Sequence, residues 1–333
     1  MDSIFLCGRS AYEYWNGIRT DGTPRLDEGT PVPRKSPWFG MDTTRLKTVS
    51  AAPPSDDLVY SFLDDELKGY ALPLELLVAR PSTRRVSNIK RCSVWGALLP
   101  SGSFVRVGSR LYVSTPEFLL LQMAATLPLI DLTVFAYELC GFYARSHWGF
   151  AASERCRPLT SVRTLSSYTS RVKDAPGIKR LRRSLRFVVD GSASPMETIV
   201  VLLLCLPRSL GGYGLPFPKM NGRVDVPMGL RDTLGGSYIL CDAYWCAARF
   251  AVEYDGRLYH EGSDRVHRDY ARSNSLRALG VGVETLTIVE VNDLVLFDAA
   301  ARRVARALGV KLRGLDAAWK VRRQELRSQL LRV

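Results

Sequence analysis

Three acidic residues in the last third of the chain have the types and spacing of a cation site. Asp242 ends one apolar stretch, and Glu253 and Asp255 lie in the next one, two residues apart. Because side chains alternate along a strand, Glu253 and Asp255 would share one face. The ten residues between Asp242 and Glu253 suffice for a hairpin that brings Asp242 beside them. Three converging carboxylates would repel one another without a cation, so we expect Mg²⁺ or Mn²⁺, ions that can activate water against a phosphodiester.

Four further residues could support that chemistry. His260 follows Asp255 by five residues and could act as a general base or position a water or phosphate oxygen. Arg268 and Arg272 fall on the next expected helix, where they could bind phosphate or brace the carboxylates. Glu197, early on an upstream helix, could reach the same site.

Each of these residues also has an ordinary structural interpretation. An aspartate at a strand end is commonly a turn residue, and Asp255-Gly256 is a common turn dipeptide. Arg268 can pair with Asp264 one helical turn earlier. Glu197 can face the dipole of its helix, and His260 can lie on the surface. The ordered combination is therefore more specific than any single residue.

The elements that would position these residues form an alternating pattern. Ser194-Pro195-Met196-Glu197 has the cap, proline and acid of a helix start, and an apolar run to Leu206 follows. Strands are expected at 222–227, 237–243, 247–255 and 281–287, and helices at 263–279 and 291–308. This order predicts an α/β fold with a largely apolar central strand.

The preceding part of the chain predicts an α+β and helical region. Residues 1–57 are rich in proline, glycine and polar residues and are expected to form loop, apart from a short helix over 10–15. A strand is expected at 74–79 and a hairpin at 104–113. Ser114-Thr115-Pro116-Glu117 then predicts a helix start, and helices continue to about residue 186, with breaks near Ser146–Pro158 and at Pro176-Gly177.

The segment from Ser194 to about Gly309 resembles the PD-(D/E)XK nuclease superfamily, and within it the very-short-patch-repair (Vsr) endonuclease-like branch. The matching residues, in order, are Ser194–Glu197, Gly214-Leu215-Pro216, Asp242, Val252–Gly256, Tyr259-His260, Arg268-Asp269, Arg272, Leu276, Leu279-Gly280 and the strand through Val281–Thr287. The resemblance implies a restriction-endonuclease-like mixed sheet flanked by helices, with Mg²⁺ or Mn²⁺ at Asp242 and Glu253. Asp255 stands where many members carry the motif lysine, although members of this branch often carry an acid there. His260, Arg268 or Arg272 would then have to substitute for the lysine.

The region before the nuclease-like segment resembles AbiEi-type antitoxin proteins. The residues that carry this resemblance are Leu74–Ala79, Arg84-Arg85, Val107-Gly108 and Val113–Glu117. Such antitoxins are DNA-binding transcriptional regulators with an N-terminal winged helix, but the first 60 residues here show no helix-turn-helix pattern. The chain is thus expected to comprise a poorly defined segment (1–69), an AbiEi-like region with a basic helical connector (70–190), a nuclease-like domain (191–310) and a basic C-terminal helix (311–333).

Composition and charge are compatible with a nucleic-acid partner. The 333 residues carry a formal net charge of +13, and the excess gathers around 171–186 and 302–332. Such clusters would attract a phosphate backbone, although a solvated helix face would look the same. No apolar run approaches the length of a membrane span, and the scattered cysteines are expected to be reduced thiols of a cytoplasmic protein. The apolar stripe in the tail favours packing or a protein-partner surface.

Three functions remain open on these grounds. The first is a metal-dependent DNA endonuclease-like protein of a defence, repair or mobile-element system. The alternative is a non-catalytic DNA-binding transcriptional regulator or antitoxin of AbiEi type that retains a degenerate nuclease fold, since fold alone does not fix function. A protein–protein interaction module is a third possibility. The sequence does not distinguish DNA from RNA or define the oligomeric state.

Overall fold

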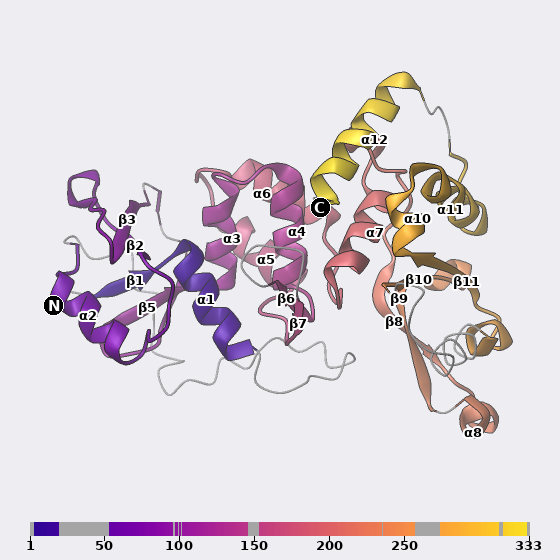
Figure 1. The fold of residues 1–333 in the computed structure, drawn as a ribbon, viewed down its shortest axis with the longest axis horizontal. Coiled ribbons are helices and arrows are strands. Elements are labelled where there is room, and N and C mark those ends of the chain that lie inside the picture. The colour runs from indigo at the N-terminus through magenta and orange to yellow at the C-terminus, as the bar shows by residue number, and fades with distance from the viewer. Residues whose placement is uncertain are drawn as a thin grey trace. The chain divides into compact units, whose positions relative to one another are not determined.

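The computed structural model describes residues 3–19, 53–95, 97–98, 100, 102–145, 153–234, 236–256, 274–312 and 316–331. These residues form two compact units (Figure 1). The first contains residues 3–19, 53–139 and 156–186, and the second contains 140–145, 153–155 and 187–331, with the gaps given above. His260, Arg268 and Arg272, and most of the helix expected at 263–279, lie outside the described residues.

The first unit is built on a mixed five-stranded sheet. Its strands are β1 (Ile4–Leu6), β2 (Leu74–Val78), β3 (Lys90–Val94), β4 (Phe104–Arg106) and β5 (Leu111–Ser114), in the order β3-β2-β1-β5-β4. β1 is parallel to β5 and antiparallel to β2. The expected strand at 74–79 and hairpin at 104–113 are confirmed. The expectation of loop around residues 4–6 is wrong: these three residues form the buried central strand, which is too short to show an alternating pattern.

Helices complete the first unit. They are α1 (Gly8–Arg19), α2 (Asp56–Asp64), α3 (Pro116–Ala124), α4 (Leu129–Leu139), α5 (Val162–Ser170) and α6 (Ile178–Ser184). The predicted start of α3 is confirmed, with the Thr115 side chain accepting a hydrogen bond from the Phe118 amide. A fully buried ion pair between Arg19 and Glu138 joins α1 to α4, and the Tyr12 hydroxyl donates to the same carboxylate. Because both charges are paired, their burial is tolerated.

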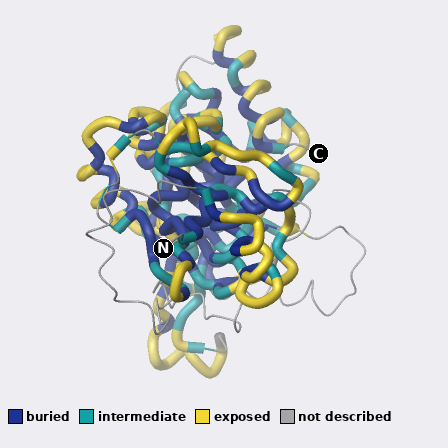
Figure 2. The backbone as a smooth tube through the Cα atoms, turned by 90° about the vertical axis from the view of Figure 1, so that its left-hand side faces the viewer, coloured by how far each residue is buried: buried dark blue, intermediate teal, exposed yellow. Residues whose placement is uncertain are grey.

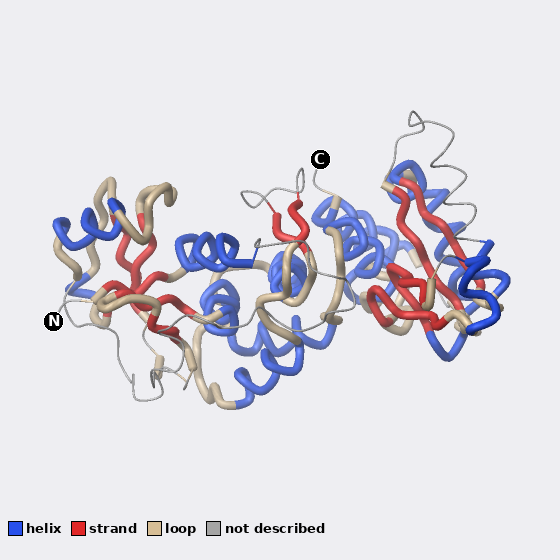
Figure 3. Tube along the Cα trace, turned by 90° about the horizontal axis from the view of Figure 1, so that it is seen from below, coloured by secondary structure: helices blue, strands red, loops and turns tan. Residues whose placement is uncertain are grey.

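The second unit is built on a four-stranded mixed sheet, which confirms the α/β class (Figure 3). Its strands are β8 (Lys219–Asp225), β9 (Tyr238–Trp245), β10 (Phe250–Asp255) and β11 (Gly282–Thr287), in the order β11-β10-β9-β8. β8, β9 and β10 are antiparallel neighbours, whereas β11 is parallel to β10. A separate two-stranded ribbon pairs β6 (Tyr143–Arg145) with β7 (Ser153–Arg155).

The helices of the second unit follow the expected order with one correction. They are α7 (Pro195–Cys205), α8 (Arg231–Leu234), α10 (Ile288–Asn292), α11 (Leu294–Ala307) and α12 (Ala317–Leu330). The helix expected at 291–308 corresponds to α11, except that its first two residues belong to α10. The two helices are separate because the Asp293 carboxylate accepts hydrogen bonds from the amides of Val295 and Leu296 and so begins α11. Figure 2 marks the buried positions in dark blue and the exposed positions in yellow along the backbone.

The C-terminal helix packs on the second unit through its apolar stripe. The Trp319 ring is buried and its indole N–H donates to the Gly212 carbonyl at 3.0 Å. Leu326 and Leu330 are also buried. The Arg327 guanidinium donates to the carbonyls of Val291 and Asn292 at the end of α10. Packing, as expected from the tail's pattern, is therefore confirmed for this helix.

Two further expectations can be compared with the fold. Six of the seven cysteines are buried, Cys246 is exposed, and all seven are free thiols. Within the described ranges, the helices are too short or too polar to cross a membrane.

Candidate metal-binding site

The two principal carboxylates lie where strands β9 and β10 part. The antiparallel ladder between these strands runs from the pair Phe250–Trp245 to the pair Val252–Ala243. Asp242 is the next residue on β9, and Glu253 is the next on β10. β9 continues beyond this point with β8 as its partner, out to the pair Asp225–Tyr238. The two acids thus occupy adjacent positions at the end of the ladder, as the sequence predicts for a hairpin.

A hydrogen bond from β10 holds the Asp242 carboxylate of β9 just beyond the end of the ladder between the two strands. Its Oδ2 accepts from the Tyr254 backbone amide at 2.8 Å. Tyr254 directly follows Glu253, so the Asp242 side chain reaches β10 beside that carboxylate. Both acids are half-buried, and the neighbouring strand residues Cys241 and Ala251 are fully buried in the core cluster of the sheet. The two carboxylates are therefore partly desolvated and lie beside the buried core of the sheet.

Glu197 joins Asp242 electrostatically. It lies in the first turn of α7, and its Oε2 accepts from the Ala193 amide at 2.8 Å and from the Asn221 side-chain amide at 3.1 Å. Burial, and then the negative charge of Asp242, raise the pKa of Glu197 to about 8 against the opposing effect of these donors. The sequence-based suggestion that Glu197 reaches the site is thus matched by an electrostatic interaction with Asp242, and its helix-start role is also present.

Asn221 is a residue of this site that sequence reasoning missed. It has a positive φ of 45°, and its side-chain amide donates to the Gly191 carbonyl at 2.8 Å as well as to Glu197. Asparagine tolerates this backbone region better than most residues. The only local signal was its neighbour Gly222, and nothing in the sequence linked position 221 to Glu197, 24 residues earlier.

Asp255 ends β10, two residues beyond Glu253 and therefore on the same face of the strand. In the parallel register it lies opposite Thr287. Thr287 caps α10 in a reciprocal capping box with Glu290. Asp255 thus stands beside the start of a helix and further along the strand than the pair formed by Asp242 and Glu253.

The described residues provide carboxylates but no complete metal cage. Within the ranges that the structure covers, no three histidine, cysteine, aspartate or glutamate side chains are grouped to hold a metal ion. His260 and the phosphate-binding candidates Arg268 and Arg272 are outside those ranges. The donors that are described, oxygen atoms of mutually repelling carboxylates, are of the kind that Mg²⁺ and Mn²⁺ prefer.

The chain was also compared with known protein families, curated proteins and solved structures. No family model matches the chain, and no curated protein or solved structure was found to match it.

Proposed function

We propose that the second unit is a metal-dependent DNA endonuclease-like domain of the PD-(D/E)XK type, similar to the Vsr branch. The observation that supports this most directly is the contact between the Asp242 side chain and strand β10. Its carboxylate bonds the Tyr254 amide, adjacent to Glu253, and its charge helps to raise the pKa of Glu197. Adjacent carboxylates held in a partly buried place are destabilised by their mutual repulsion, which a divalent cation relieves.

In this proposal Asp242 and Glu253 hold Mg²⁺ or Mn²⁺, and Asp255 assists from the same face of β10. The bound cation would supply Lewis-acid polarisation of a phosphodiester and acidify a water. The Asp242 orientation is set by its bond to Tyr254. Glu197, held by the amides of Ala193 and Asn221, tunes the local charge from α7. His260 would position the attacking water, and Arg268 and Arg272 would bind the phosphate.

The experiment is cleavage of supercoiled plasmid, mismatched duplex and single-stranded DNA with Mg²⁺ or Mn²⁺. Asp242→Asn keeps an acceptor for the Tyr254 amide but removes the charge, so the fold should persist while cleavage is lost. Glu253→Gln should behave alike. Asp225→Asn is the matched control, because Asp225 lies on β8 and pairs with the exposed Arg223; it should cleave like the wild type. Cleavage that survives both site substitutions would refute the proposal.

The second candidate is a non-catalytic DNA-binding regulator or antitoxin of AbiEi type that uses a degenerate nuclease fold. The bond from the Tyr254 amide to Asp242 favours it, because it gives this carboxylate a structural role in joining β9 to β10. Salt-sensitive DNA binding without cleavage by a well-folded wild-type chain would select this candidate.

A further inference from the structure

The structure separates the predicted basic clusters into cations that stabilise the protein and cations that remain available. Arg180 donates to the carbonyls of Ala124 and Leu127 at the end of α3. Arg182 likewise donates to the carbonyls of Thr169, in the last turn of α5, and of Val172 just after it. Arg303 on α11 donates to Glu284 of β11 at 3.0 Å. These arginines are used within the fold and do not count toward a binding surface.

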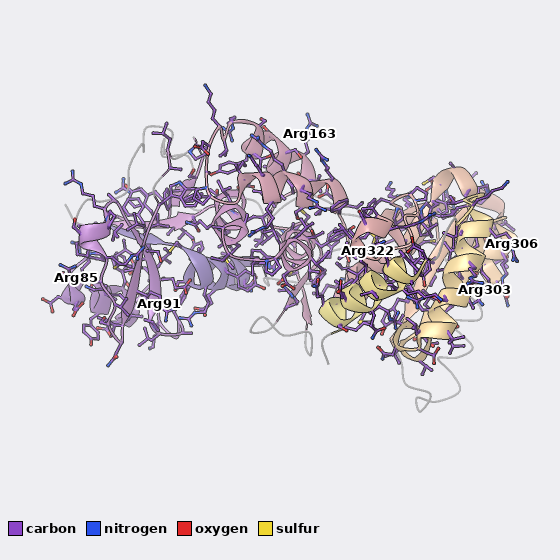
Figure 4. All side chains as sticks on the ribbon, turned by 90° about the horizontal axis from the view of Figure 1, so that it is seen from above. Arg85, Arg91, Arg163, Arg303, Arg306 and Arg322 are labelled. Carbon is purple, nitrogen blue, oxygen red and sulfur yellow. The ribbon has the colours of Figure 1, made fainter. Side chains whose placement is uncertain are left out.

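Three cations of the second cluster are arranged differently. Arg302 and Arg306 extend from α11, and Lys311 follows the helix; all three are exposed. In the part of the chain that the structure covers, no hydrogen bond or ion pair engages their side chains. They line a surface hollow of about 420 Å³, which we call the α11 groove, together with Ala305, Val310 and Leu312. Figure 4 shows Arg306 on this helix, beside the engaged Arg303.

The groove is formed by the way α11 ends. Gly309 has a φ of 68°, its amide donates to the Arg306 carbonyl, and the Val310 amide donates to the Ala305 carbonyl. This is a Schellman arrangement, in which a left-handed residue reverses the chain after a helix. The reversal brings Lys311 and Leu312 to the same hollow as Arg302 and Arg306. Cations from two segments therefore converge on one concave surface, and among the residues that the structure describes its lining contains no acid.

We propose that the α11 groove binds the phosphate backbone of a nucleic acid. This proposal takes its partner class from the proposed function but concerns binding, not cleavage. Arg302 and Arg306 are separated by one helical turn, about 6 Å along the axis. That is close to two steps of the roughly 3.4 Å per charge by which one DNA strand advances along the axis of the duplex. Three cations around apolar floor residues thus suit a repeating anionic strand.

Some of these cations have a structural reason to be there, because positive charge interacts favourably with the negative C-terminal end of the α11 dipole. This interaction accounts for Arg302 and Arg306 in the last turns of the helix. It does not account for Lys311, which lies beyond the reversal at Gly309 and lines the same hollow. The convergence of the three residues is what distinguishes the groove from an ordinary basic helix end.

The test measures affinity for a fluorescent 20-base-pair duplex of mixed sequence, by anisotropy, in EDTA and over a series of salt concentrations. The full chain is compared with the triple variant Arg302→Gln, Arg306→Gln, Lys311→Gln. Each phosphate contact contributes about 0.9 to the slope of log affinity against log salt. The triple variant is therefore expected to bind more weakly and to lose about 2–3 from that slope. Its melting temperature should fall by only a few degrees, because the favourable interaction of Arg302 and Arg306 with the helix dipole is lost.

A matched variant controls for net charge. Lys179→Gln, Arg183→Gln, Arg186→Gln removes three exposed cations from α6 and the turn after it, at the same change in formal charge. A smaller slope change in this variant supports the groove. An equal change in both variants, or an unchanged slope in the groove variant, overturns the proposal. Wild-type binding to polyglutamate as tight as to the duplex would also overturn it, in favour of an acidic protein partner.

Because EDTA removes the metal, this result is independent of cleavage. Loss of plasmid cleavage in Asp242→Asn with a normal salt slope would support the proposed function and leave the groove unaffected. A reduced slope in the groove variant of a chain that cleaves nothing would support the groove and reject the enzyme.

Discussion

Glu197 is the residue whose ionisation should most affect the stability of the metal-free protein. Its pKa rises from 4.5 to about 8, first through burial and then through the charge of Asp242. A carboxyl with a raised folded-state pKa favours the folded state when protonated. The stability that the protonated Glu197 contributes to the folded state is therefore fully present below pH 4.5 and is lost as the pH rises to about 8.

We expect Glu197→Gln, measured in EDTA, to melt a few degrees above the wild type at pH 8.5 and to lose that advantage near pH 5. The glutamine can still accept from the amides of Ala193 and Asn221 but carries no charge. Glu325→Gln on the exposed face of α12 is the control and should show no such pH dependence. Parallel melting curves for wild type and Glu197→Gln across this range would contradict the assignment.

The residues of the candidate site differ in how far the sequence could predict them. Asp242 and Glu253 were predictable because their positions depend on local strand alternation and one short hairpin. Asn221 was not, because its role depends on a tertiary contact with α7. Glu197 was recognisable both as a helix-start acid and as a possible site residue; it lies in the first turn of α7 and interacts electrostatically with Asp242.

At the scale of the elements, those that begin with a local sequence signal were predictable, and those without one were not. The starts of α3 and α7 follow from a hydroxyl cap, a proline and an acid, all local in sequence. The break between α10 and α11 also has a local cause, the Asp293 cap, but it lies inside a periodic apolar pattern that indicates a continuous helix. β1 lacked any local signal, because its three buried residues acquire their strand character from β2 and β5.

The reversal at the end of α11 should depend on Gly309. Its φ of 68° strains any residue with a Cβ, although no atom of the described residues, its chain neighbours apart, lies within 4 Å of the place where that Cβ would stand. We expect Gly309→Ala to lower the free energy of unfolding by about 1–2 kcal/mol, the usual penalty of the left-handed conformation. Denaturant unfolding measures this change.

Gly17 provides a control with the opposite sign. It lies in helix α1 and has no positive φ, and outside its own helix backbone and chain neighbours no atom in the part of the chain that the structure describes lies within 4 Å of the place of its missing Cβ. Gly17→Ala should therefore raise stability, by about 0.5–1 kcal/mol, because alanine loses less backbone entropy in a helix. The same sign of change in both variants would argue against conformational strain at Gly309.

At the scale of the whole molecule, the α/β class and most strands followed from the pattern of apolar residues. The grouping of the chain did not. The structure joins residues 3–19 to strands more than 60 residues later, and it places residues 140–145 in the second unit. Such groupings depend on which buried faces pack together over long sequence separations, and a single sequence records no local signal for that choice.

Because the chain forms two compact units, we expect metal binding to change the hydrogen-exchange rates of the second unit only. If Asp242 and Glu253 hold the ion, Mn²⁺ relieves the repulsion between them. Because the ion would bind only the folded state, it stabilises the end of the ladder between β9 and β10. We expect hydrogen exchange with Mn²⁺ to slow across residues 238–256 and to stay unchanged across β1, β2 and β5. Asp242→Asn should abolish this protection, since it keeps the acceptor for the Tyr254 amide but removes a charge. Slowing of equal size in the first unit, or in Asp242→Asn, would place the ion elsewhere and separate metal binding from the two carboxylates.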